Sequence, residues 1–275
     1  MTPAISSGVA FEKARADGRA ALIGYLPAGF PTVDGGIAAV RAMVDAGCDA
    51  LEIGLPYSDP VMDGPTIQRA AQQALDNGVR IRDVLATVEA AAATGTPTLV
   101  MTYWNPVERY GVERFATDLA AAGGAGLITP DITPDARTDW SAAADAHDLD
   151  KVYLVAPSST DERVAMTVQA SRGFVYAAAV MGVTGARTTT SQLAGPLVER
   201  TRAAASRLGK DLPVAVGIGV STGDQAADVA AFADGVIVGS AFVRALLDHP
   251  DDEAAGIAAL AALTADLAEG VRRGR

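Results

Sequence analysis

Residues 50–64, ALEIGLPYSDPVMDG, place a carboxylate inside an apolar run and two more in the loop that follows. The run around Glu52 has the length and composition of a short buried strand, and Pro56 and Pro60 break the chain after it. A carboxylate at such a position is desolvated, which is costly unless the group is paired or protonated. The stretch therefore predicts a strand that carries a functional group to its C-terminal end.

Seven further runs resemble this strand, and Ala-rich helical patterns separate them. The eight expected strands lie near residues 20–26, 50–55, 97–103, 125–130, 151–157, 173–179, 213–218 and 235–240. Alternating strands and helices indicate parallel strands joined by right-handed crossovers. Eight such units predict a single α/β domain over residues 1–275, a (β/α)8 TIM barrel with an extra N-terminal helix around residues 3–16.

Composition excludes several classes of protein. The 275 residues include 49% hydrophobic but only 5% aromatic residues, and the net charge is −11 with a pI near 4.6. This acidity argues against a nucleic-acid surface or an anionic membrane partner. Cys48 is the only cysteine, so no intrachain disulfide is expected. The N-terminus does not resemble a secretory signal, and no apolar run of about eighteen residues is uninterrupted, so we expect a cytoplasmic protein.

In a TIM barrel, the polar groups just after each strand are the candidates for catalysis. The chain has three lysines, Lys13, Lys151 and Lys210, and none lies at the C-terminal end of an expected strand. A Schiff-base mechanism therefore has no candidate amine. His147 and His249 also lie away from strand ends, so no metal site is expected. Carboxylates, hydroxyls and backbone amides must then carry any catalysis.

Glycine-rich loops follow the last three expected strands, as MGVTGAR (181–187), VGIGVST (216–222) and VGSAFV (238–243). Glycine lets the backbone approach an anion, and a helix N-terminus supplies free N–H groups. We therefore expect phosphate binding, with contacts from Gly217, Gly219, Gly239 and Ser240 and with Gly185 completing the cradle.

Glu52 points either into the barrel or toward the helix layer, and in both places it is desolvated. Burial raises the pKa of a carboxyl toward neutrality, where it can both give and take a proton. The alternative is a structural, hydrogen-bonded glutamate. Asp63 lies further along the same loop, and two carboxyls in different surroundings can divide acid and base roles. Tyr176, in the sixth expected strand, either reaches the same cavity or serves only in packing.

The stretch LEIGLPYSDPVMDGPTIQ (51–68) resembles the signature of the tryptophan synthase alpha chain family. Further segments match along the chain: GYLPAGFPT, MTYWNPVERYG, PDITPDA, GVTGAR, VGIGVST and VGSAFV. The resemblance thus covers essentially the whole length. It departs at Pro27 and Phe30, where many members carry Thr and Asp, and at Val180 and Met181, where an arginine is often seen.

The resemblance implies a lyase that cleaves indole-3-glycerol phosphate to indole and D-glyceraldehyde 3-phosphate in tryptophan biosynthesis. It assigns Asp63 to the indole N–H and Glu52 to proton transfer at indole C3 and the glycerol hydroxyl. Because the indole ring is the electron sink, no lysine or metal is needed. Tyr176 and Thr184 would assist this pair. The indole pocket would comprise Tyr25, Met101, Ile128 and Ile218, and the phosphate would bind Gly185, Gly217, Gly219, Gly239 and Ser240.

The resemblance also implies a partner, a beta chain that carries pyridoxal phosphate and receives indole within an allosteric α2β2 complex. No cofactor is expected in the present chain. Pro56, Asp59 and the loop from Val180 to about Thr190 would face the partner. A stand-alone indole-releasing lyase, or a non-catalytic phosphate-binding subunit, remain alternatives. An indole-glycerol phosphate synthase is disfavoured, since that enzyme would need lysine at strand ends.

Overall fold

The computed structural model describes residues 5–178, 187–217 and 219–274 and confirms the predicted barrel. Its parallel strands follow the chain order around a closed barrel, in which β1 pairs with both β2 and β8. The strands are β1 (Ala21–Pro27), β2 (Ala50–Gly54), β3 (Thr98–Met101), β4 (Gly126–Thr129), β5 (Asp150–Val155), β6 (Val175–Ala178), β7 (Val214–Gly217) and β8 (Gly235–Val238). The two ends of each strand lie within two residues of the predicted ends, and most strands end one or two residues earlier than predicted.

The helical layer is richer than one helix for each strand. Two helices separate β2 from β3 and two separate β3 from β4, because Gly78 and Gly111 adopt positive φ angles of 81° and 100° that interrupt the helical runs. Two more follow β8. The helices that precede β5 are α1 (Gly8–Ala16), α2 (Val33–Asp45), α3 (Pro65–Asp76), α4 (Ile81–Ala92), α5 (Trp104–Tyr110), α6 (Val112–Ala121) and α7 (Thr138–Ala146). The helices that follow it are α8 (Asp161–Ala170), α9 (Arg187–Arg207), α10 (Gly223–Ala230), α11 (Ser240–Leu247) and α12 (Glu253–Arg273).

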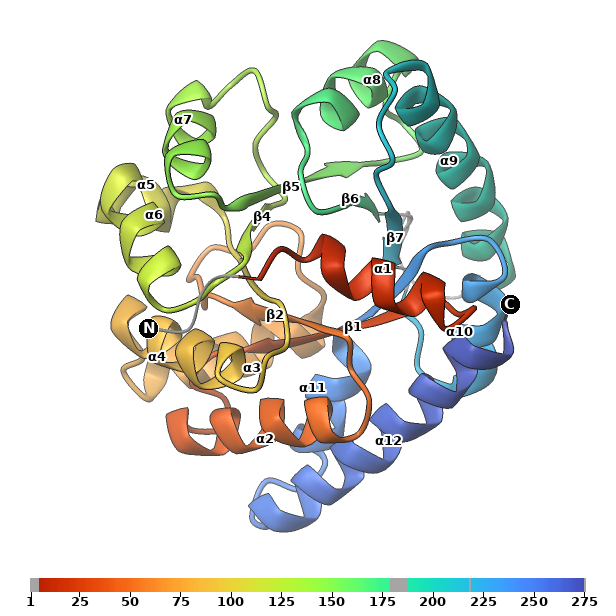
Figure 1. Ribbon diagram of the computed structural model, residues 1–275. Helices are drawn as coiled ribbons and strands as arrows, with labels where there is room; N and C mark the ends of the chain where they lie inside the picture. Colours follow the sequence, from red (N-terminus) through yellow and green to blue (C-terminus); the bar gives the residue numbers. More distant parts are fainter. Residues whose placement is uncertain (1–4, 179–186, 218, 275) are drawn as a thin grey trace.

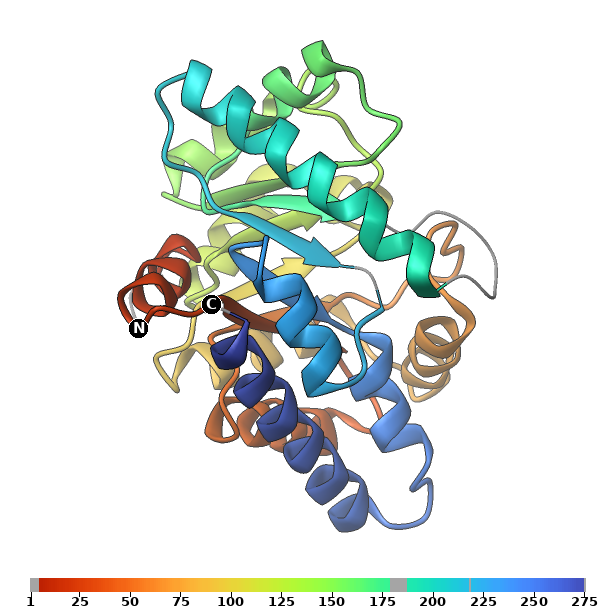
Figure 2. The same ribbon diagram turned by 90° about the vertical axis from the view of Figure 1, so that its right-hand side faces the viewer.

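The predicted extra helix, α1, closes the N-terminal end of the barrel. It lies across this end in Figure 1, and in Figure 2 it lies on the side from which the strands start. Its buried residues Ala10, Phe11 and Ala14 join the cluster of side chains inside the barrel. The ring of Phe11 meets that of Phe174 at a centroid distance of 5.2 Å. Within the described part of the chain, this leaves the opposite end of the barrel, where the strands end, for ligand entry.

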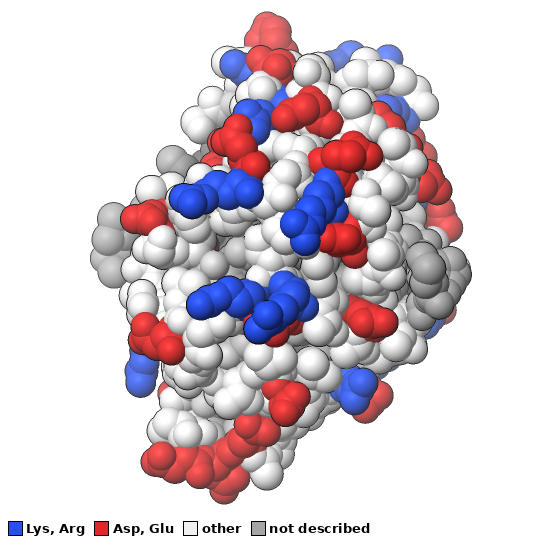
Figure 3. Space-filling view, turned by 90° about the vertical axis from the view of Figure 1, so that its left-hand side faces the viewer, with Lys and Arg blue, Asp and Glu red and all other residues white. Residues whose placement is uncertain are grey.

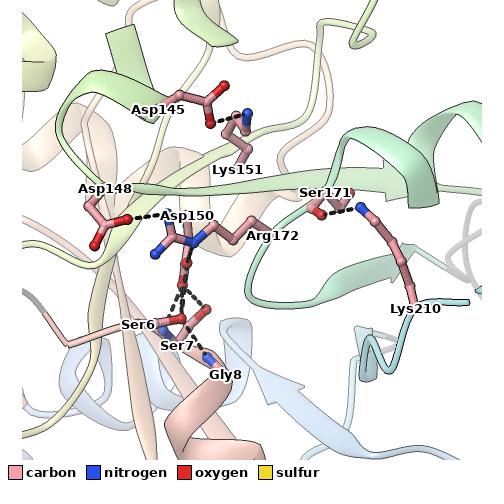
Figure 4. Close-up of polar contacts among 10 residues, drawn as sticks. All are labelled: Ser6, Ser7, Gly8, Asp145, Asp148, Asp150, Lys151, Ser171, Arg172 and Lys210. Carbon is pink, nitrogen blue, oxygen red and sulfur yellow. Dashed lines mark hydrogen bonds and ion pairs between the residues drawn. The ribbon is translucent and has the colours of Figure 1, made fainter. Parts of the chain in front are cut away.

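A buried carboxylate fastens the segment before α1. Asp150, which is 0% exposed at the start of β5, accepts hydrogen bonds from the Ser7 backbone N–H and hydroxyl, both at 2.6 Å, and from the Ser6 hydroxyl at 3.0 Å. The Arg172 guanidinium lies 3.4 Å from the same carboxylate. Figure 4 shows these groups converging on Asp150. The N-terminal helix is thus held by both apolar packing and a buried polar cluster.

One described helix, α12, is long and apolar enough by length and composition alone to cross a membrane. In this fold it packs against α2, α10 and α11 and buries Leu260, Leu267 and Val271. Its apolar side therefore belongs to the main core between helices and strands.

Figure 3 shows acidic and basic side chains interspersed on the face that carries α5, α6 and α7.

Candidate active site

A cavity of about 350 Å³ opens at the C-terminal ends of the strands. This is the end toward which the strand arrows point in Figure 2, opposite α1. The cavity gathers side chains and glycines from β1, β2, β3, β6, β7 and β8 and from the loops that follow β2, β7 and β8. Its lining includes Tyr25, Glu52, Asp63, Met101, Tyr176, Gly217, Gly219, Gly239 and Ser240.

Glu52 points into the barrel, which decides between the two orientations that the sequence allowed. It stands in register with Tyr25 on β1 and Leu99 on β3, and it lines the mouth cavity. The residue is 1% exposed, and neither carboxyl oxygen has a hydrogen-bond partner among the described residues. Burial raises the pKa of Glu52 to about 8. A carboxyl in this state can donate or accept a proton near neutral pH.

Asp63 occupies a different environment in the same cavity. It lies in the loop between β2 and α3, where it is half-buried. Burial raises the pKa of Asp63, and a hydrogen bond from the Tyr103 hydroxyl opposes that rise. A partly solvated, hydrogen-bonded carboxyl therefore faces a dry, unpaired one. This asymmetry is the arrangement that separates an electrostatic role from an acid–base role.

Two tyrosines flank Glu52, and glycines make room for both. Burial raises the pKa of Tyr25 and of Tyr176, and the nearby Glu52 carboxyl raises both further. A Cβ at Gly54 would stand 2.7 Å from the ring of Tyr25, and a Cβ at Gly217 would stand 2.9 Å from Cζ of Tyr176. Glycine at these two strand ends thus permits the phenols to lie over the barrel mouth.

The glycine-rich side of the cavity has the features of an anion site. Gly219 adopts a φ of 76° in the loop after β7, and Gly239 caps α11, which begins at Ser240. The first N–H groups of a helix have no intrahelical acceptor, and the helix dipole favours an anion there. No acidic residue lies in the first turn of α11. A phosphate group at this position would meet backbone donors from two loops.

The structure brings most of the sequence-predicted residues together, with the exceptions that follow. Ile128 is 0% exposed and packs inside the barrel rather than lining the cavity. Thr184, Gly185 and Ile218 lie outside the described residues, as do Val180 and Met181. The cavity also includes Met62, Gly64, Ile67 and Ile237, which the sequence interpretation did not select. Met62 follows the end of β2, the signal that singled out Asp63, whereas Ile67 lies in α3 and Ile237 within β8.

The predicted partner-facing positions differ in exposure. Pro56 is buried within the chain, whereas Asp59 is exposed and accepts a hydrogen bond from the Ser58 hydroxyl at 2.5 Å. Next to Asp59, Val61 and Met62 are 82% and 55% exposed. These are two of the few large apolar side chains exposed in the described part of the chain, and they lie beside the cavity entrance. Of the predicted partner-facing loop from Val180 to about Thr190, residues 180–186 lie outside the described residues.

A larger cavity, of about 470 Å³, lies at the N-terminal end beside α1. Its cationic side chains all have partners, several of which Figure 4 shows. Lys151 contacts Asp145 at 2.5 Å, and Lys210 donates to the Ser171 carbonyl at 3.2 Å. Arg172 contacts Asp148 at 2.6 Å. These lysines therefore act in structure, which agrees with their positions away from the C-terminal ends of the strands, and this cavity is not the candidate active site.

Comparisons with known proteins agree with this geometry. The family model described as tryptophan synthase alpha chain matches residues 11–272. A tryptophan synthase alpha chain from Salinispora arenicola is 63% identical over 265 residues, which is 96% of this chain and 97% of that protein. A Mycobacterium tuberculosis tryptophan synthase structure aligns with a TM-score of 0.89 at 57% identity, covering 98% of this chain and 99% of that one. A tryptophan synthase subunit alpha from Legionella pneumophila aligns with a TM-score of 0.83 at 32% identity, covering 98% and 99%.

Proposed function

The chain belongs to the tryptophan synthase alpha chain family, and from this premise we propose that it cleaves indole-3-glycerol phosphate to indole and D-glyceraldehyde 3-phosphate. The observation that carries the proposal is Glu52, a buried carboxyl with two unpaired oxygens in a cavity that also contains Asp63. A buried carboxyl without a hydrogen-bond partner destabilises the fold. Its presence at this position therefore favours a functional role, in which the substrate supplies the missing contact.

The reaction requires one proton at indole C3 and the loss of one from a glycerol hydroxyl. We assign the first transfer to Glu52, which protonates C3 and turns the ring into an electron-poor tautomer. The Asp63 carboxylate accepts a hydrogen bond from the indole N–H and stabilises the positive charge that develops on the ring. Glu52, now a carboxylate, then removes the hydroxyl proton. The O–H electrons form the aldehyde C=O, and the electrons of the broken C–C bond restore the aromatic indole.

The remaining cavity residues bind and orient the substrate. We assign Tyr25 and Met101 to the indole ring and Tyr176 to the neighbourhood of Glu52, because all three line the cavity beside it. Gly217, Gly219, Gly239 and Ser240 would bind the phosphate group on the opposite side. Thr184, Gly185 and Ile218 keep the roles that the family resemblance implies, whereas Ile128 packs inside the barrel and is not assigned to the indole pocket.

We also propose that the chain acts with a beta chain, in an α2β2 complex whose pyridoxal phosphate is bound by the partner. The exposed pair Val61 and Met62 supports this, because apolar side chains beside a cavity entrance are favourable in a protein interface. Asp59 would lie at the edge of that contact. A soluble cytoplasmic location and a single domain over residues 1–275 complete the proposal.

Indole release from indole-3-glycerol phosphate, measured with and without a beta chain, tests the function directly. We expect release in at least one condition, with stimulation by the partner if the two chains form a complex. Equal rates in both conditions would favour a stand-alone lyase. Failure of the wild-type protein to release indole in either condition would contradict the lyase and favour a non-catalytic binding subunit.

Substitution of the two carboxyls tests their assigned roles. We expect Glu52→Gln to lower turnover by at least about 100-fold, because general acid–base catalysis contributes that much, with little change in the affinity for a phosphate ligand. Asp63→Asn should also lower turnover. Glu89→Gln on the exposed surface of α4 is the matched control. Turnover of Glu52→Gln within about tenfold of wild type, under about 1.4 kcal/mol, would remove Glu52 from the acid–base role.

A further inference from the structure

We propose that Tyr103 is the positioning residue of Asp63: its hydroxyl accepts the Met62 N–H and lines the same small cavity as Asp63, from which we infer that it donates to the Asp63 carboxylate and fixes the direction in which that carboxylate faces the cavity. This inference rests on the proposed function and adds a residue to it. The sequence analysis did not select Tyr103. It is one of two adjacent aromatic residues in MTYWNP, and an aromatic residue at this position also suits core packing.

The hydrogen bonds around the Tyr103 hydroxyl determine where its proton points. The Met62 backbone N–H donates to this oxygen at 2.9 Å. A phenol oxygen that accepts one bond retains its own proton for donation. The Asp63 side chain lines the same small cavity as Tyr103, and the hydroxyl lowers the pKa of Asp63 against the effect of burial. One hydroxyl therefore binds two consecutive residues of the catalytic loop.

The ring that carries this hydroxyl is itself held in place. Tyr103 is 6% exposed, and its ring packs on that of Tyr57 at a centroid distance of 5.3 Å. The Thr102 hydroxyl donates to the Tyr103 carbonyl at 2.9 Å. The following backbone N–H, that of Trp104, donates to the Asp131 carboxylate at 3.0 Å. The hydroxyl thus projects from a segment anchored to β3 and to the loop after β4.

Anchoring matters because Asp63 lies on a loop rather than on a strand. A catalytic carboxylate needs a fixed orientation toward the ring that it stabilises, and a loop residue needs an outside contact to obtain one. Tyr103 supplies this contact from the neighbouring strand end. Without the hydroxyl, the Met62 N–H loses its acceptor and the half-buried Asp63 carboxylate loses a donor. Both changes favour a displaced or protonated Asp63.

Other titratable groups also face Asp63. Tyr25 on β1, Glu52 on β2 and Tyr176 on β6 line the same cavity. Burial raises the pKa of Asp63, whereas the Tyr103 hydroxyl lowers it. Removal of that hydroxyl therefore raises the pKa of Asp63 further. If catalysis requires the ionised carboxylate, the acidic limb of the pH–rate profile must move to higher pH.

Tyr103→Phe isolates this effect, because it keeps the packed ring and removes only the hydroxyl. In the full-length chain with its beta chain, we expect kcat/KM for indole-3-glycerol phosphate to fall by about 10- to 100-fold, the usual consequence of losing a hydrogen bond to a charged group. The acidic limb should shift upward, by roughly one pH unit. The affinity for an indole alkyl phosphate that cannot be cleaved should change by less than about threefold, since phosphate contacts are untouched.

Tyr110→Phe is the matched control. Its hydroxyl also donates to a carboxylate, that of Asp118 at 2.5 Å, but in α5 and α6 outside the cavity. We expect this variant to keep the wild-type rate and profile. A fall in rate for Tyr103→Phe that is equal at all pH values, with the acidic limb unmoved, would indicate general structural damage and overturn the inference. Wild-type activity in Tyr103→Phe would overturn it as well.

The outcome separates this inference from the proposed function. Absence of cleavage by the wild-type chain would contradict the function, whereas wild-type cleavage with an unshifted Tyr103→Phe profile would contradict only the role of Tyr103. If the Phe variant fails to fold, 3-fluorotyrosine at position 103 replaces it. Its more acidic phenol donates a stronger hydrogen bond, so the acidic limb should move to lower pH. An unmoved limb in this variant would also overturn the inference.

Discussion

Tyr25 on β1 and Glu52 on β2 are direct register partners, so that a half-buried phenol lies beside a carboxyl whose oxygens are both unpaired among the described residues. Neither group is stabilised as an anion in this arrangement. Burial raises the pKa of Tyr25, and the carboxyls of Asp63 and Glu52 add to that rise. The folded chain therefore favours neutral forms on both strands, which has a measurable consequence for stability.

Glu52→Gln is expected to stabilise the protein above neutral pH. The pKa of Glu52 is raised to about 8 in the folded chain from an ordinary value of 4.5, so the folded state binds more protons between these values. Stability therefore falls as pH rises through this window, and glutamine removes the loss. Urea unfolding at pH 5 should give similar free energies for both proteins. At pH 8 the variant should be more stable, on the order of 3 kcal/mol.

The exposed Glu89→Gln variant should show no such pH-dependent difference. An equal stability difference at pH 5 and pH 8 would contradict the raised pKa of Glu52. A smaller stability in the variant at pH 8 would indicate that the carboxylate is paired in solution, which is contrary to its unpartnered oxygens.

Gly217→Ala is expected to impair catalysis through Tyr176. The new Cβ would stand 2.9 Å from Cζ and 3.0 Å from Cε1 of the Tyr176 ring. Since the ring is rigid and half-buried, it must tilt toward the cavity that it lines, which narrows the substrate site and disturbs the surroundings of Glu52. We expect kcat/KM to fall by about tenfold or more and stability by about 1–3 kcal/mol, the usual cost of overpacking. Steady-state kinetics and urea unfolding measure the two effects.

Gly256→Ala in α12 provides a control for the same substitution. Its Cβ would lie 3.4 Å from the Cβ of His249, an ordinary contact. Alanine in a helix interior is favoured over glycine, so this variant should be more stable by about 0.5–1 kcal/mol at unchanged activity. Wild-type kinetics in Gly217→Ala would show that the Tyr176 ring can relax without disturbing the site.

The strands could be predicted from sequence because each is a short apolar run followed by glycine, proline or a polar residue. The paired helices could not be predicted in the same way. Residues 65–92 read as one Ala-rich region, and only the positive φ of Gly78 separates α3 from α4. A glycine in a helical pattern is compatible with either an interruption or a tolerated substitution, and packing decides between them.

The site was predictable where a residue conflicts with its surroundings. Glu52 is an ionisable side chain in an otherwise apolar, buried strand. Glycine-rich loops after three consecutive strands are more than chain reversal alone would require. Tyr103 gives no such conflict, because an aromatic residue near a strand end also suits a core. Its significance depends on the path of the loop that brings Met62 and Asp63 back over β3, a tertiary feature that residue spacing does not encode.

Asp49→Ala should destabilise the fold without affecting the active site. Asp49 forms a two-point contact with Arg19, at 2.6 and 2.8 Å, and accepts the Leu22 N–H at 2.9 Å. Both side chains of the pair are about nine-tenths buried. Removing the carboxylate leaves the buried guanidinium only its longer contacts with the exposed Asp17 carboxylate and the Ala20 carbonyl, both at 3.3 Å, so we expect a loss below the roughly 3–5 kcal/mol of a fully unpaired buried charge. Urea unfolding should show this loss, and unchanged kcat/KM would confirm that it does not reach the barrel mouth.

Replacement of Arg19 and Asp49 together by leucine tests the cause. Because the double variant leaves no unpaired charge, it should recover much of the stability that Asp49→Ala loses. Equal losses in both variants would show that the Leu22 N–H bond, rather than the ion pair, is the important contact.

Asp150→Ala should release α1 from the barrel. The substitution removes the acceptor of the Ser7 N–H and of two serine hydroxyls, and it leaves the Arg172 guanidinium with its exposed partner Asp148 alone. A buried N–H without an acceptor costs about 1–3 kcal/mol, so we expect a loss of at least this size. Hydrogen exchange should accelerate first in residues 8–16, because only the apolar contacts of Ala10, Phe11 and Ala14 and the exposed Arg15–Asp211 ion pair are then known to hold the described part of the helix.

Asp148→Asn is the matched control for this prediction, because asparagine tolerates the left-handed backbone of this position, where φ is 60°. Its side chain is 87% exposed and contacts only Arg172 among the ion pairs of the described residues, so it should change stability by less than about 1 kcal/mol. Catalysis should persist in Asp150→Ala below its melting temperature, since the active site lies at the other end of the barrel. Uniform acceleration of exchange across all strands would show instead that α1 and the barrel unfold as one unit. In that case Asp150 would stabilise the whole fold through the N-terminal helix, and the loss in unfolding free energy should equal that of deleting residues 1–16.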